Sequence, residues 1–520
     1  MNCLKIEPQN PYKMLKTDIL IIGSGISGLF FAMKTAKKRP DLSIVIMTKK
    51  TAPNTNTQLA QGGIAVVTNH IKDSFEQHIK DTLKSGGGHC DQAIVKMVIE
   101  QAPERLEELL KIGTSFDKNQ EGQWDLGLEG GHSQHRILHH KDSSGLEIEK
   151  KLLKIIEQLP NIQLFENYQV IDLNTETKQE QTTSCGAFFY DKNTDQIKYI
   201  RTRCIVLSTG GCGQLFENTT NPEIATGDGI AMAARAGAEI EDMQYIQFHP
   251  TALFRGEKNP LFLISEAVRG FGAHIVNEEG KRFLFKYDSR GELATRDIVS
   301  HAIYREMHES RKKHVYLDCR HLDPSAFYQK FPSIAKHCNE IELFPEKDLI
   351  PIVPAAHYQC GGIKVDRNGL TTVKNLYAIG ECARTGLHGK NRLASNSLLE
   401  ALVFAHQASE NINSTIDSFE FSSKILVPKF TGTENKKDHV TFLVLKKEIQ
   451  ALLTNFYLSE ERDTDFAFQK IKLIKNAAET LAAKQQITIP FIEFSNMLTV
   501  ALIIIKHCKK RKTPFIMSLN

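Results

Sequence analysis

The feature that most constrains the fold is a glycine-rich turn between an apolar strand and an apolar helix near the N-terminus. The run DILII at residues 18–22 predicts a buried strand, and the helix after the turn leads to a second strand, SIVIM, at residues 43–47. Gly23, Gly25 and Gly28 have the spacing that lets a backbone turn tightly and approach a pyrophosphate at a helix N-terminus. The sequence therefore predicts a βαβ dinucleotide-binding unit, the alternative being a chance turn.

The residues after the second strand indicate which dinucleotide this unit binds. In NAD-binding units an acidic residue at this place binds the ribose, but here Met47 is followed by Thr48, Lys49 and Lys50. This departure disfavours ordinary NAD binding. It favours FAD, with Lys49 near the adenosine end.

The length of 520 residues exceeds what one hydrophobic core usually supports, so two or three domains are expected. Short apolar runs at residues 204–209 and 375–379 each end in glycine and would add strands to the first sheet. We predict an α/β protein with a Rossmann-like FAD-binding domain in two parts, an inserted α+β capping domain and a C-terminal three-helix domain. Their predicted bounds are 1–242 and 354–417 for the FAD-binding domain, 243–353 for the capping domain and 430–520 for the helical domain. The cleft between the first two would be the active site.

Apolar residues near the C-terminus recur at helical spacing in three groups. The groups are Leu445, Ile449, Leu452 and Phe456; Phe468, Ile471, Ile474, Ala478 and Leu481; and Phe491, Phe494, Leu498, Ala501 and Ile505. The apolar run at residues 498–505 is far shorter than the ~20 residues that a membrane span needs. The basic residues 509–512 predict a solvated helix end, with a nucleic-acid or anionic surface contact as the alternative.

Composition excludes several classes of protein. The 65 basic and 61 acidic residues are too balanced for a dedicated nucleic-acid binder, and we expect no nucleic-acid or membrane partner. The ten cysteines form no C-x-x-C pair, which disfavours structural zinc and a secreted disulfide scaffold. With no secretory segment at the N-terminus, we expect a cytoplasmic protein. A zinc site at His132, His135, His139 and His140 is a weaker alternative to no metal, because no acidic or thiol ligand completes a familiar spacing.

Six separated motifs resemble the succinate dehydrogenase/fumarate reductase flavoprotein family. The first, NTQLAQGG at residues 56–63, is a polar loop that could cover a flat ring system, although alone it also fits a surface turn. The others, in the family's order, are TGDG at 226–229, QFHPT at 247–251, RD at 296–297, AHY at 356–358 and HGKNR at 388–392. The resemblance covers about residues 16–415. The C-terminal helices match the family only in character.

The resemblance implies a set of FAD contacts. In this sequence they are Gly23, Ser24, Gly25, Ile26, Ser27, Gly28, Lys49, Asn56, Thr57, Gln58, Leu59, Ala60, Gln61, Gly62, Gly63, Asp228, Glu381, Ser397 and Leu398. Glu381 directly follows a predicted strand, where it could accept hydrogen bonds from ribityl hydroxyls or be a solvated charge. Asn56 stands where membrane-complex relatives have a histidine that bonds covalently to flavin. Because asparagine cannot form that bond, we expect non-covalent FAD.

The resemblance also implies a dicarboxylate site. Buried carboxylates need fixed donors, and the family pattern places His249, Ser265, His357 and Arg392 in that role. Proton transfer would fall to Arg296, linked to Glu266 and Arg269. The alternative is a buried ion cluster of these three side chains that only holds the capping domain.

The run EGGHS at residues 129–133 decides the expected substrate. A carboxylate at Glu129 would repel succinate and attract an α-ammonium group, although its apolar neighbour Leu128, where relatives commonly show a polar residue, leaves its protonation state open. The resemblance then implies oxidation of L-aspartate to iminoaspartate, with hydride transfer from Cα to flavin N5 and reoxidation by oxygen or fumarate. In the family, this product feeds quinolinate and de novo NAD biosynthesis, so a transient contact with quinolinate synthase is expected.

Two other functions compete with this interpretation. A soluble fumarate reductase or a succinate dehydrogenase flavoprotein would share the dicarboxylate site, but Asn56 and Glu129 disfavour both. An electron-carrier or RNA-associated FAD protein would be supported only by the basic C-terminus. It would leave the histidines and arginines of the site without a role.

Overall fold

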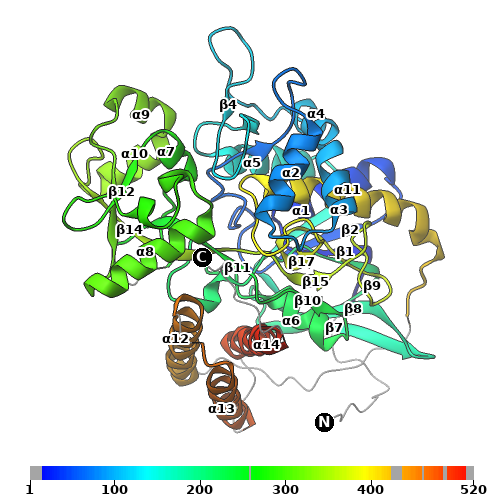
Figure 1. Ribbon diagram of the computed structural model, residues 1–520. Helices are drawn as coiled ribbons and strands as arrows, with labels where there is room; N and C mark the ends of the chain where they lie inside the picture. The colour runs from blue at the N-terminus through cyan, green and yellow to red at the C-terminus, as the bar shows by residue number, and fades with distance from the viewer. Residues whose placement is uncertain (1–13, 257–258, 423–435, 460–461, 484–488, 511–520) are drawn as a thin grey trace.

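The computed structural model describes residues 14–256, 259–422, 436–459, 462–483 and 489–510, and its largest sheet has seven strands (Figure 1). The strands run in the order β6-β2-β1-β9-β8-β7, and β16 also pairs with β9. β1 is parallel to β2 and β9, and β16 is parallel to β9, so the runs predicted at 204–209 and 375–379 do join the first sheet. The strands are β1 (Met14–Ile22), β2 (Ile44–Thr48), β6 (Ile162–Glu166), β7 (Tyr168–Lys178), β8 (Gln181–Asp191), β9 (Gln196–Leu207) and β16 (Leu376–Ala378).

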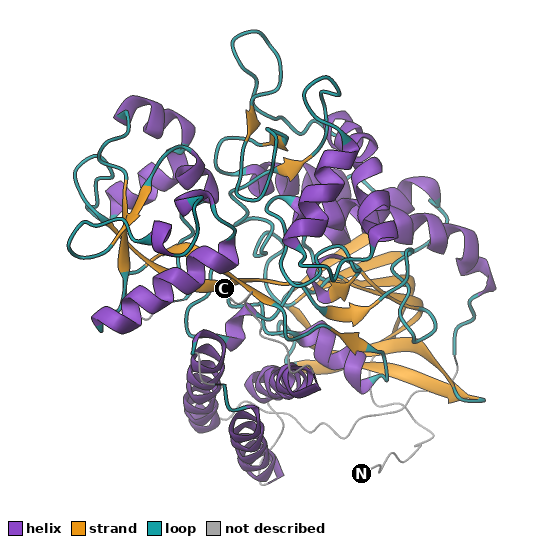
Figure 2. Ribbon diagram, in the orientation of Figure 1, coloured by secondary structure: helices purple, strands orange, loops and turns teal. Residues whose placement is uncertain are grey.

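Alternate side chains of β1 face two different hydrophobic clusters, because a strand in the middle of a covered sheet is buried on both faces. Ile19 and Ile21 pack with one group of helices, and Leu20 and Ile22 pack with another. Figure 2 shows the sheet between these two groups. The first group is α1 (Ile26–Lys38), α2 (Phe75–Ser85), α3 (Gln92–Glu100), α4 (Ala102–Lys111), α5 (Ser144–Ile156) and α11 (Asn396–Thr415). The second includes α6 (Asp228–Arg235) and the C-terminal helices.

Two small sheets complete this part of the protein. One has the order β3-β5-β4 and the other β10-β15-β17. Their strands are β3 (Ile64–Ala65), β4 (Leu126–Gly127), β5 (Ile137–Leu138), β10 (Ile240–Glu241), β15 (Gly362–Lys364) and β17 (Ala383–Arg384). Short 3-10 turns lie at η1 (Gly213–Leu215), η4 (Gly380–Cys382) and η5 (Ile416–Ser418).

The segment between β10 and β15 forms an antiparallel sheet with its own helices and its own hydrophobic cluster, at the left of Figure 1. The strand order is β11-β14-β13-β12, with β11 (Ile246–Leu253), β12 (His274–Val276), β13 (Val315–Asp318) and β14 (Ile350–Gln359). The helices are α7 (Glu266–Gly270), η2 (Leu284–Lys286), η3 (Gly291–Leu293), α8 (Arg296–Ser310), α9 (Pro324–Lys330) and α10 (Pro332–Glu340). Because β11 and β14 are also the connections to the rest of the chain, residues near their ends lie at the border of both parts.

Three C-terminal helices pack against the second face of the large sheet: α12 (Lys436–Leu458), α13 (Thr464–Ala483) and α14 (Ile489–Lys510). Their apolar side chains share one hydrophobic cluster with the sheet, and the ring of Tyr457 lies 5.3 Å from that of Phe216 and 6.1 Å from that of Phe248. The predicted positions Ile449, Phe456, Ile471, Ile474, Ala478, Phe494, Leu498, Ala501 and Ile505 are buried. Leu481 and residues 511–512 lie outside the described side chains.

By length and composition alone, α14 is the one helix in the described part of the chain that could span a bilayer. However, 56% of its most apolar window is buried inside the protein. This is the pattern of a core helix.

Candidate active site

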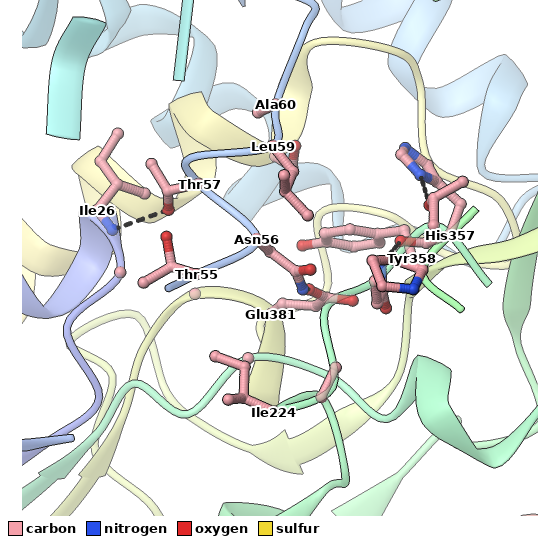
Figure 3. Close-up of a pocket in the computed structure, with 18 of the residues that line it drawn as sticks. Ile26, Thr55, Asn56, Thr57, Leu59, Ala60, Ile224, His357, Tyr358 and Glu381 are labelled. Atoms are coloured by element: carbon pink, nitrogen blue, oxygen red, sulfur yellow. Dashed lines mark hydrogen bonds between the residues drawn. The ribbon is translucent and has the colours of Figure 1, made fainter. Parts of the chain in front are cut away.

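A cavity of about 900 Å³ lies between the large sheet and the inserted segment. Figure 3 shows Ile26, Thr55 and Thr57 on one side of it, Asn56 and Glu381 in the middle, and His357 on the opposite side. Loops that follow strands of the sheet line the first part, whereas β11, β14 and α8 line the last. The cavity is therefore long and chemically different at its two ends.

The first end is built on the glycine turn. Gly23 has φ +111°, and a Cβ there would lie 2.2 Å from the carbonyl oxygen of Ser208, so only glycine fits. Gly25 precedes α1 without providing a side-chain cap, and among the first amides Ile26 N–H donates to Thr57 Oγ1 at 3.0 Å. The N-terminus of this 13-residue helix thus faces the cavity with backbone donors and positive dipole available to an anion.

Lys49 lines the cavity within a charged network that includes α14. Its Nζ lies 2.7 Å from Asp228 Oδ2 and 2.9 Å from Glu493 Oε1, and it donates to Thr226 Oγ1 at 2.7 Å. Burial alone would lower the pKa of Lys49, but the two carboxylates hold it above its ordinary value, so the ammonium stays charged. Asp228 also accepts a hydrogen bond from Asn496 Nδ2 at 2.8 Å. The C-terminal helix therefore fixes two side chains of the cavity.

Asn56 and Glu381 meet in the middle of the cavity (Figure 3). Asn56 Nδ2 donates to Glu381 Oε2 at 3.1 Å, and the Gln359 N–H donates to Oε1 at 3.1 Å. Burial raises the pKa of Glu381 to about 7. A carboxyl group that titrates near neutral pH can accept or donate hydrogen bonds to ligand hydroxyls.

These features fit FAD. The volume lies near the upper end of the ~300–1,000 Å³ range of small-molecule sites. The N-terminus of α1, where Gly25 provides no side-chain cap, suits a pyrophosphate. The central carboxyl group suits ribityl hydroxyls, and the tight glycine turn lets the backbone approach the ligand.

Two neutral histidines face the other end of the cavity. The pairing of β11 with β14 shifts register twice around His249, an irregularity that re-aims side chains, and the rings of His249 and His357 lie 5.1 Å apart. Burial, reinforced by the charge of Arg296, holds the pKa of both rings well below the ordinary value. The Thr251 N–H donates to His249 Nδ1 at 3.3 Å, so the neutral ring carries its proton on Nε2. His357 Nδ1 is held 2.8 Å from the hydroxyl of Thr220.

Arg392 supplies a buried cation beside these rings. It donates to Ser397 Oγ at 2.9 Å, and its guanidinium lies 4.3 Å from the centre of the Tyr358 ring. Burial, with Arg296 nearby, lowers its pKa to about 10, which still leaves it charged at neutral pH. Its Nε is buried and has no hydrogen-bond partner in the described part of the chain. Such a group can bind a carboxylate.

Arg296, at the start of α8, is held by two side chains. Its Nε donates to Glu266 Oε2 at 2.6 Å, and its Nη1 donates to Gln247 Oε1 at 3.0 Å. Glu266 Oε1 lies 2.9 Å from Arg269 Nη2. Burial alone would raise the pKa of Glu266, but Arg296 and Arg269 outweigh it and hold the pKa below its ordinary value. The three predicted side chains thus form a row of alternating charges, in which Glu266 lies between Arg296 and Arg269. Arg296 lines the cavity, whereas Arg269 does not.

Glu129 lies in the same wall, next to Glu266. A Cβ on Gly130 would lie 2.3 Å from Glu266 Oε1, which shows how closely the Gly-Gly turn approaches that carboxylate. Glu129 is only 6% exposed, and its Oε2 accepts a hydrogen bond from Ser395 Oγ at 2.6 Å. Burial, and then the charge of Glu266, raises the pKa of Glu129. Ser395 has φ +59°, a rare backbone for a non-glycine residue that often marks a functional site.

The rest of the EGGHS run holds this turn in place. His132 Nε2 lies 2.9 Å from the Ala394 carbonyl oxygen and its Nδ1 lies 3.0 Å from Arg136 Nη1. The Ser133 N–H and hydroxyl both donate to Asp81, which also pairs with Arg136 at 2.6 Å. In the described residues, no group of three His, Cys, Asp or Glu side chains is placed to hold a metal ion.

A carboxylate of the FAD-binding part caps a helix of the inserted segment. Asp142 Oδ2 accepts hydrogen bonds from the N–H groups of Ser333 at 2.8 Å and Ile334 at 2.9 Å, which open α10. Because Asp142 is 3% exposed, this bond is shielded from solvent. It ties the two sides of the cavity together.

Comparison with known proteins identifies the family. Residues 18–398 match the family described as FAD binding domain. A chloroplastic L-aspartate oxidase of Oryza sativa subsp. japonica is 43% identical over 400 residues, which are 75% of this chain and 61% of the relative. The L-aspartate oxidase of Vibrio cholerae is 36% identical over 505 residues, which are 95% of this chain and 93% of the relative. The chain belongs to the L-aspartate oxidase family.

Solved structures place this L-aspartate oxidase family member among flavoprotein folds. The E. coli quinol fumarate reductase FrdA superimposes with a TM-score of 0.86 at 27% identity, covering 97% of this chain and 91% of that one. An adenylylsulfate reductase of Archaeoglobus fulgidus has a TM-score of 0.72 at 17% identity, which shows the fold alone. The predicted fold class and the FAD cofactor are confirmed.

Most of the residues predicted for the site line one cavity. For the substrate these are Glu129, His249, Ser265, His357 and Arg392, together with Arg296 and Glu266. For the cofactor they are Gly23, Ser24, Gly25, Ile26, Ser27, Lys49, Asn56, Thr57, Leu59, Ala60, Gln61, Gly62, Gly63, Asp228, Glu381, Ser397 and Leu398.

Three predicted residues do not line it. Gly28 instead lets α1 pack closely on the turn, since a Cβ there would lie 2.5 Å from the Gly23 carbonyl oxygen. Gln58 is not part of the lining, and its backbone N–H donates to the Thr55 hydroxyl at 3.1 Å. Arg269 lies behind Glu266.

Sequence reasoning missed other residues of the cavity. Ser395 and Thr220 carry no signal beyond being polar residues in loops, and their roles appear only through their bonds to Glu129 and His357. Tyr358 and Gln247 stood inside motifs that were noticed, so their positions beside Arg392 and Arg296 could have been suspected.

Proposed function

We propose that this protein catalyses the FAD-dependent oxidation of L-aspartate to iminoaspartate. The observation that carries the proposal is the buried carboxylate of Glu129 in the wall of a cavity whose other polar groups suit a dicarboxylate. The names of the curated relatives agree with it.

The substrate has two carboxylates and one ammonium group, and the site offers matched partners. Arg392, with its buried Nε unpartnered in the described residues, binds one carboxylate as a cation. The Nε2–H of His249, with His357 beside it, donates to the other. Glu129 takes the ammonium group, whose positive charge offsets the cost of a buried carboxylate. Succinate would leave that carboxylate unpaired.

The bound FAD supplies the acceptor for the hydride that leaves Cα. The residues of the chain orient Cα, exclude water, and accept or donate protons. In the second half-reaction, when fumarate is reduced, Arg296 donates a proton to the fumarate carbon and is reprotonated through Glu266, which it contacts at 2.6 Å. Gln247 fixes the guanidinium plane from the other side.

The flavin is held without a covalent bond in this proposal. Asn56 points its amide at Glu381 in the middle of the cavity, and an amide nitrogen is too weak a nucleophile to bond to a flavin carbon as a histidine ring nitrogen can. Acid precipitation should therefore leave all flavin in the supernatant.

Fumarate and oxygen are the proposed acceptors of the electrons, and the product would feed quinolinate and NAD biosynthesis in the cytoplasm. A transient contact with quinolinate synthase belongs to this proposal, because iminoaspartate is short-lived in water.

The direct test compares substrates on the purified holoprotein. We expect oxidation of L-aspartate, measured as hydrogen peroxide formed, and no oxidation of succinate with a dye acceptor. Succinate oxidation without L-aspartate oxidation would reject the proposal in favour of a soluble succinate dehydrogenase or fumarate reductase. The similarity to the E. coli quinol fumarate reductase makes that the alternative to test.

A further inference from the structure

A second, smaller cavity lies behind Glu129. Its volume is about 40 Å³. It shares a wall with the main cavity, and this wall consists of Gln61, Gly62, Gly63, Glu129 and Ser265. The carboxyl group proposed to bind the ammonium group therefore borders two spaces.

Buried polar atoms line the small cavity. Gln61 Oε1 and Asp142 Oδ1 have no hydrogen-bond partner among the described residues, and the ring nitrogens of His139 make no hydrogen bond there but lie near two carboxylates. Buried polar groups that lack a protein partner bind ordered water, and one water needs about 10–15 Å³ of such space. The cavity has room for about two or three water molecules.

His139 lines this cavity near the protein surface. It follows β5 and is 8% exposed. Its Nδ1 lies 3.2 Å from Asp117 Oδ2 and its Nε2 lies 3.8 Å from Asp125 Oδ2. These two carboxylate side chains are 28% and 46% exposed, so they reach solvent.

Other charged groups surround the His139 ring. His140 is its neighbour, and its Nδ1 lies 3.9 Å from Asp117 Oδ1. Lys141, Asp142 and Lys330 line the small cavity together with Glu129. The ring therefore stands between a buried carboxyl group on one side and exposed carboxylates on the other.

We propose that the small cavity and His139 carry the proton lost from the substrate's ammonium group out to solvent. The inference rests on the proposed oxidation of L-aspartate. Conversion of HC–NH3+ to C=NH2+ removes one hydride, which reduces the bound flavin by two electrons, and one proton, which goes to the Glu129 carboxylate. The proton then passes through water in the small cavity to His139 and leaves beside Asp117 and Asp125.

Two observations support this route. Burial raises the pKa of Glu129, which makes its carboxylate a stronger base than an exposed one. An imidazole ring can accept a proton on one nitrogen and release another from the second nitrogen, so it suits a relay between two compartments.

The reduction of fumarate, the other proposed half-reaction, provides an internal control. Reduction of fumarate involves no ammonium group, and its proton is proposed to come through Arg296 and Glu266. A residue that serves only the ammonium proton should matter for the oxidation of L-aspartate and not for the reduction of fumarate.

The test is His139→Gln in the holoprotein, with His135→Gln as the matched control on an exposed position of the same segment. We expect His139→Gln to lower kcat for L-aspartate about tenfold, below the ~10²–10⁴-fold effect of a group that contacts the substrate. The solvent deuterium isotope effect on kcat should rise, while KM for L-aspartate and the rate of fumarate reduction stay within about twofold. His135→Gln should change none of these values.

Asp117→Asn provides a second variant in case His139→Gln loses its flavin. It should lower kcat for L-aspartate about threefold with the same rise in isotope effect. Unchanged L-aspartate turnover in the flavin-containing variants, or an equal loss in both reactions, would overturn the relay. Failure of the unmodified protein to oxidise L-aspartate would instead reject the proposed function.

Discussion

Replacing Glu129 with glutamine tests the ammonium contact directly. Glutamine keeps the shape of the side chain and can still accept the hydrogen bond from Ser395, which is 2.6 Å long, so the turn should stay in place. Only the charge is lost. Because the carboxylate is 6% exposed, its charge is poorly screened by solvent.

The size of the effect follows from two limits. A hydrogen bond to a charged group contributes about 1.5–3 kcal/mol, and two unit charges 4 Å apart interact by about 4 kcal/mol at an effective dielectric constant of 20. We therefore expect a loss of about 2–4 kcal/mol, which is a fall of roughly 30- to 700-fold in kcat/KM for L-aspartate.

The assays are peroxide formation with L-aspartate and fumarate reduction with a reduced dye. Fumarate reduction should change by less than about threefold, since fumarate has no ammonium group. The pH profile gives a second reading: kcat/KM of the unmodified protein should fall as the pH drops through the raised pKa of Glu129, and Glu129→Gln should lose this acid limb.

Glu121→Gln, an exposed change in the preceding loop, is the control and should leave both reactions unaltered. An equal loss in both reactions would mean that Glu129 only supports the fold, and the argument from charge would be refuted.

Three further predictions concern the surroundings of the site. Lys49→Met leaves its two carboxylate partners without a cation. The free energy of unfolding should fall by about 3 kcal/mol, as measured by thermal denaturation. The purified protein should also retain less FAD, as measured by flavin absorbance. Asp142→Ala removes the hydrogen bonds to the first amides of α10, which contribute about 1 kcal/mol and tie the two sides of the cavity together. KM for L-aspartate should therefore rise about fivefold in steady-state assays. Burial raises the pKa of Glu149, which accepts a hydrogen bond from Thr55, to about 8. A raised pKa stabilises the fold below about pH 4.5, and this stability is lost as the pH rises to 8. Glu149→Gln should therefore flatten the decline of Tm between pH 5 and 8, and the free energy of unfolding involved is at most about 4 kcal/mol.

Each of these has an outcome that contradicts it. An unchanged Tm and full flavin content in Lys49→Met would show that its ion pairs contribute nothing. Asp323→Ala removes the cap of α9 within the inserted segment and is the control for Asp142→Ala: a similar rise of KM in both would assign the effect to general loosening. Parallel Tm curves for Glu149→Gln and the unmodified protein would mean that this carboxyl group titrates normally.

Local pattern was enough to predict the first part of the fold. The spacing of Gly23, Gly25 and Gly28 specifies a turn in which Gly23 and Gly28 have no room for a side chain, and the apolar runs on both sides are a buried strand and a buried helix. The same holds for the short motifs of the site, because each motif places its polar residue within a few positions of a strand or helix end.

Contacts between distant segments could not be predicted. Lys49 and Glu493 are 444 residues apart. Helical periodicity predicts which face of α14 is buried, but it does not predict which side chain of the rest of the chain lies next to Glu493. The E-x-x-R spacing puts Glu266 and Arg269 on one side of a short helix, yet the rotation of that helix decides which of them reaches the cavity. In the loop at 56–63, Gln58 does not line the cavity, and this could not be predicted because a loop has no regular period of side-chain direction.

The pairing of Lys49 with Glu493 has a consequence for how the protein is made. The glycine turn and Lys49 leave the ribosome well before Glu493, which follows 444 residues after Lys49, and before Asn496. Until they do, the ammonium of Lys49 has Asp228 but not α14 beside it, and Asp228 lacks the amide that orients it. The charged network around Lys49 is thus complete only after α14 has been synthesised.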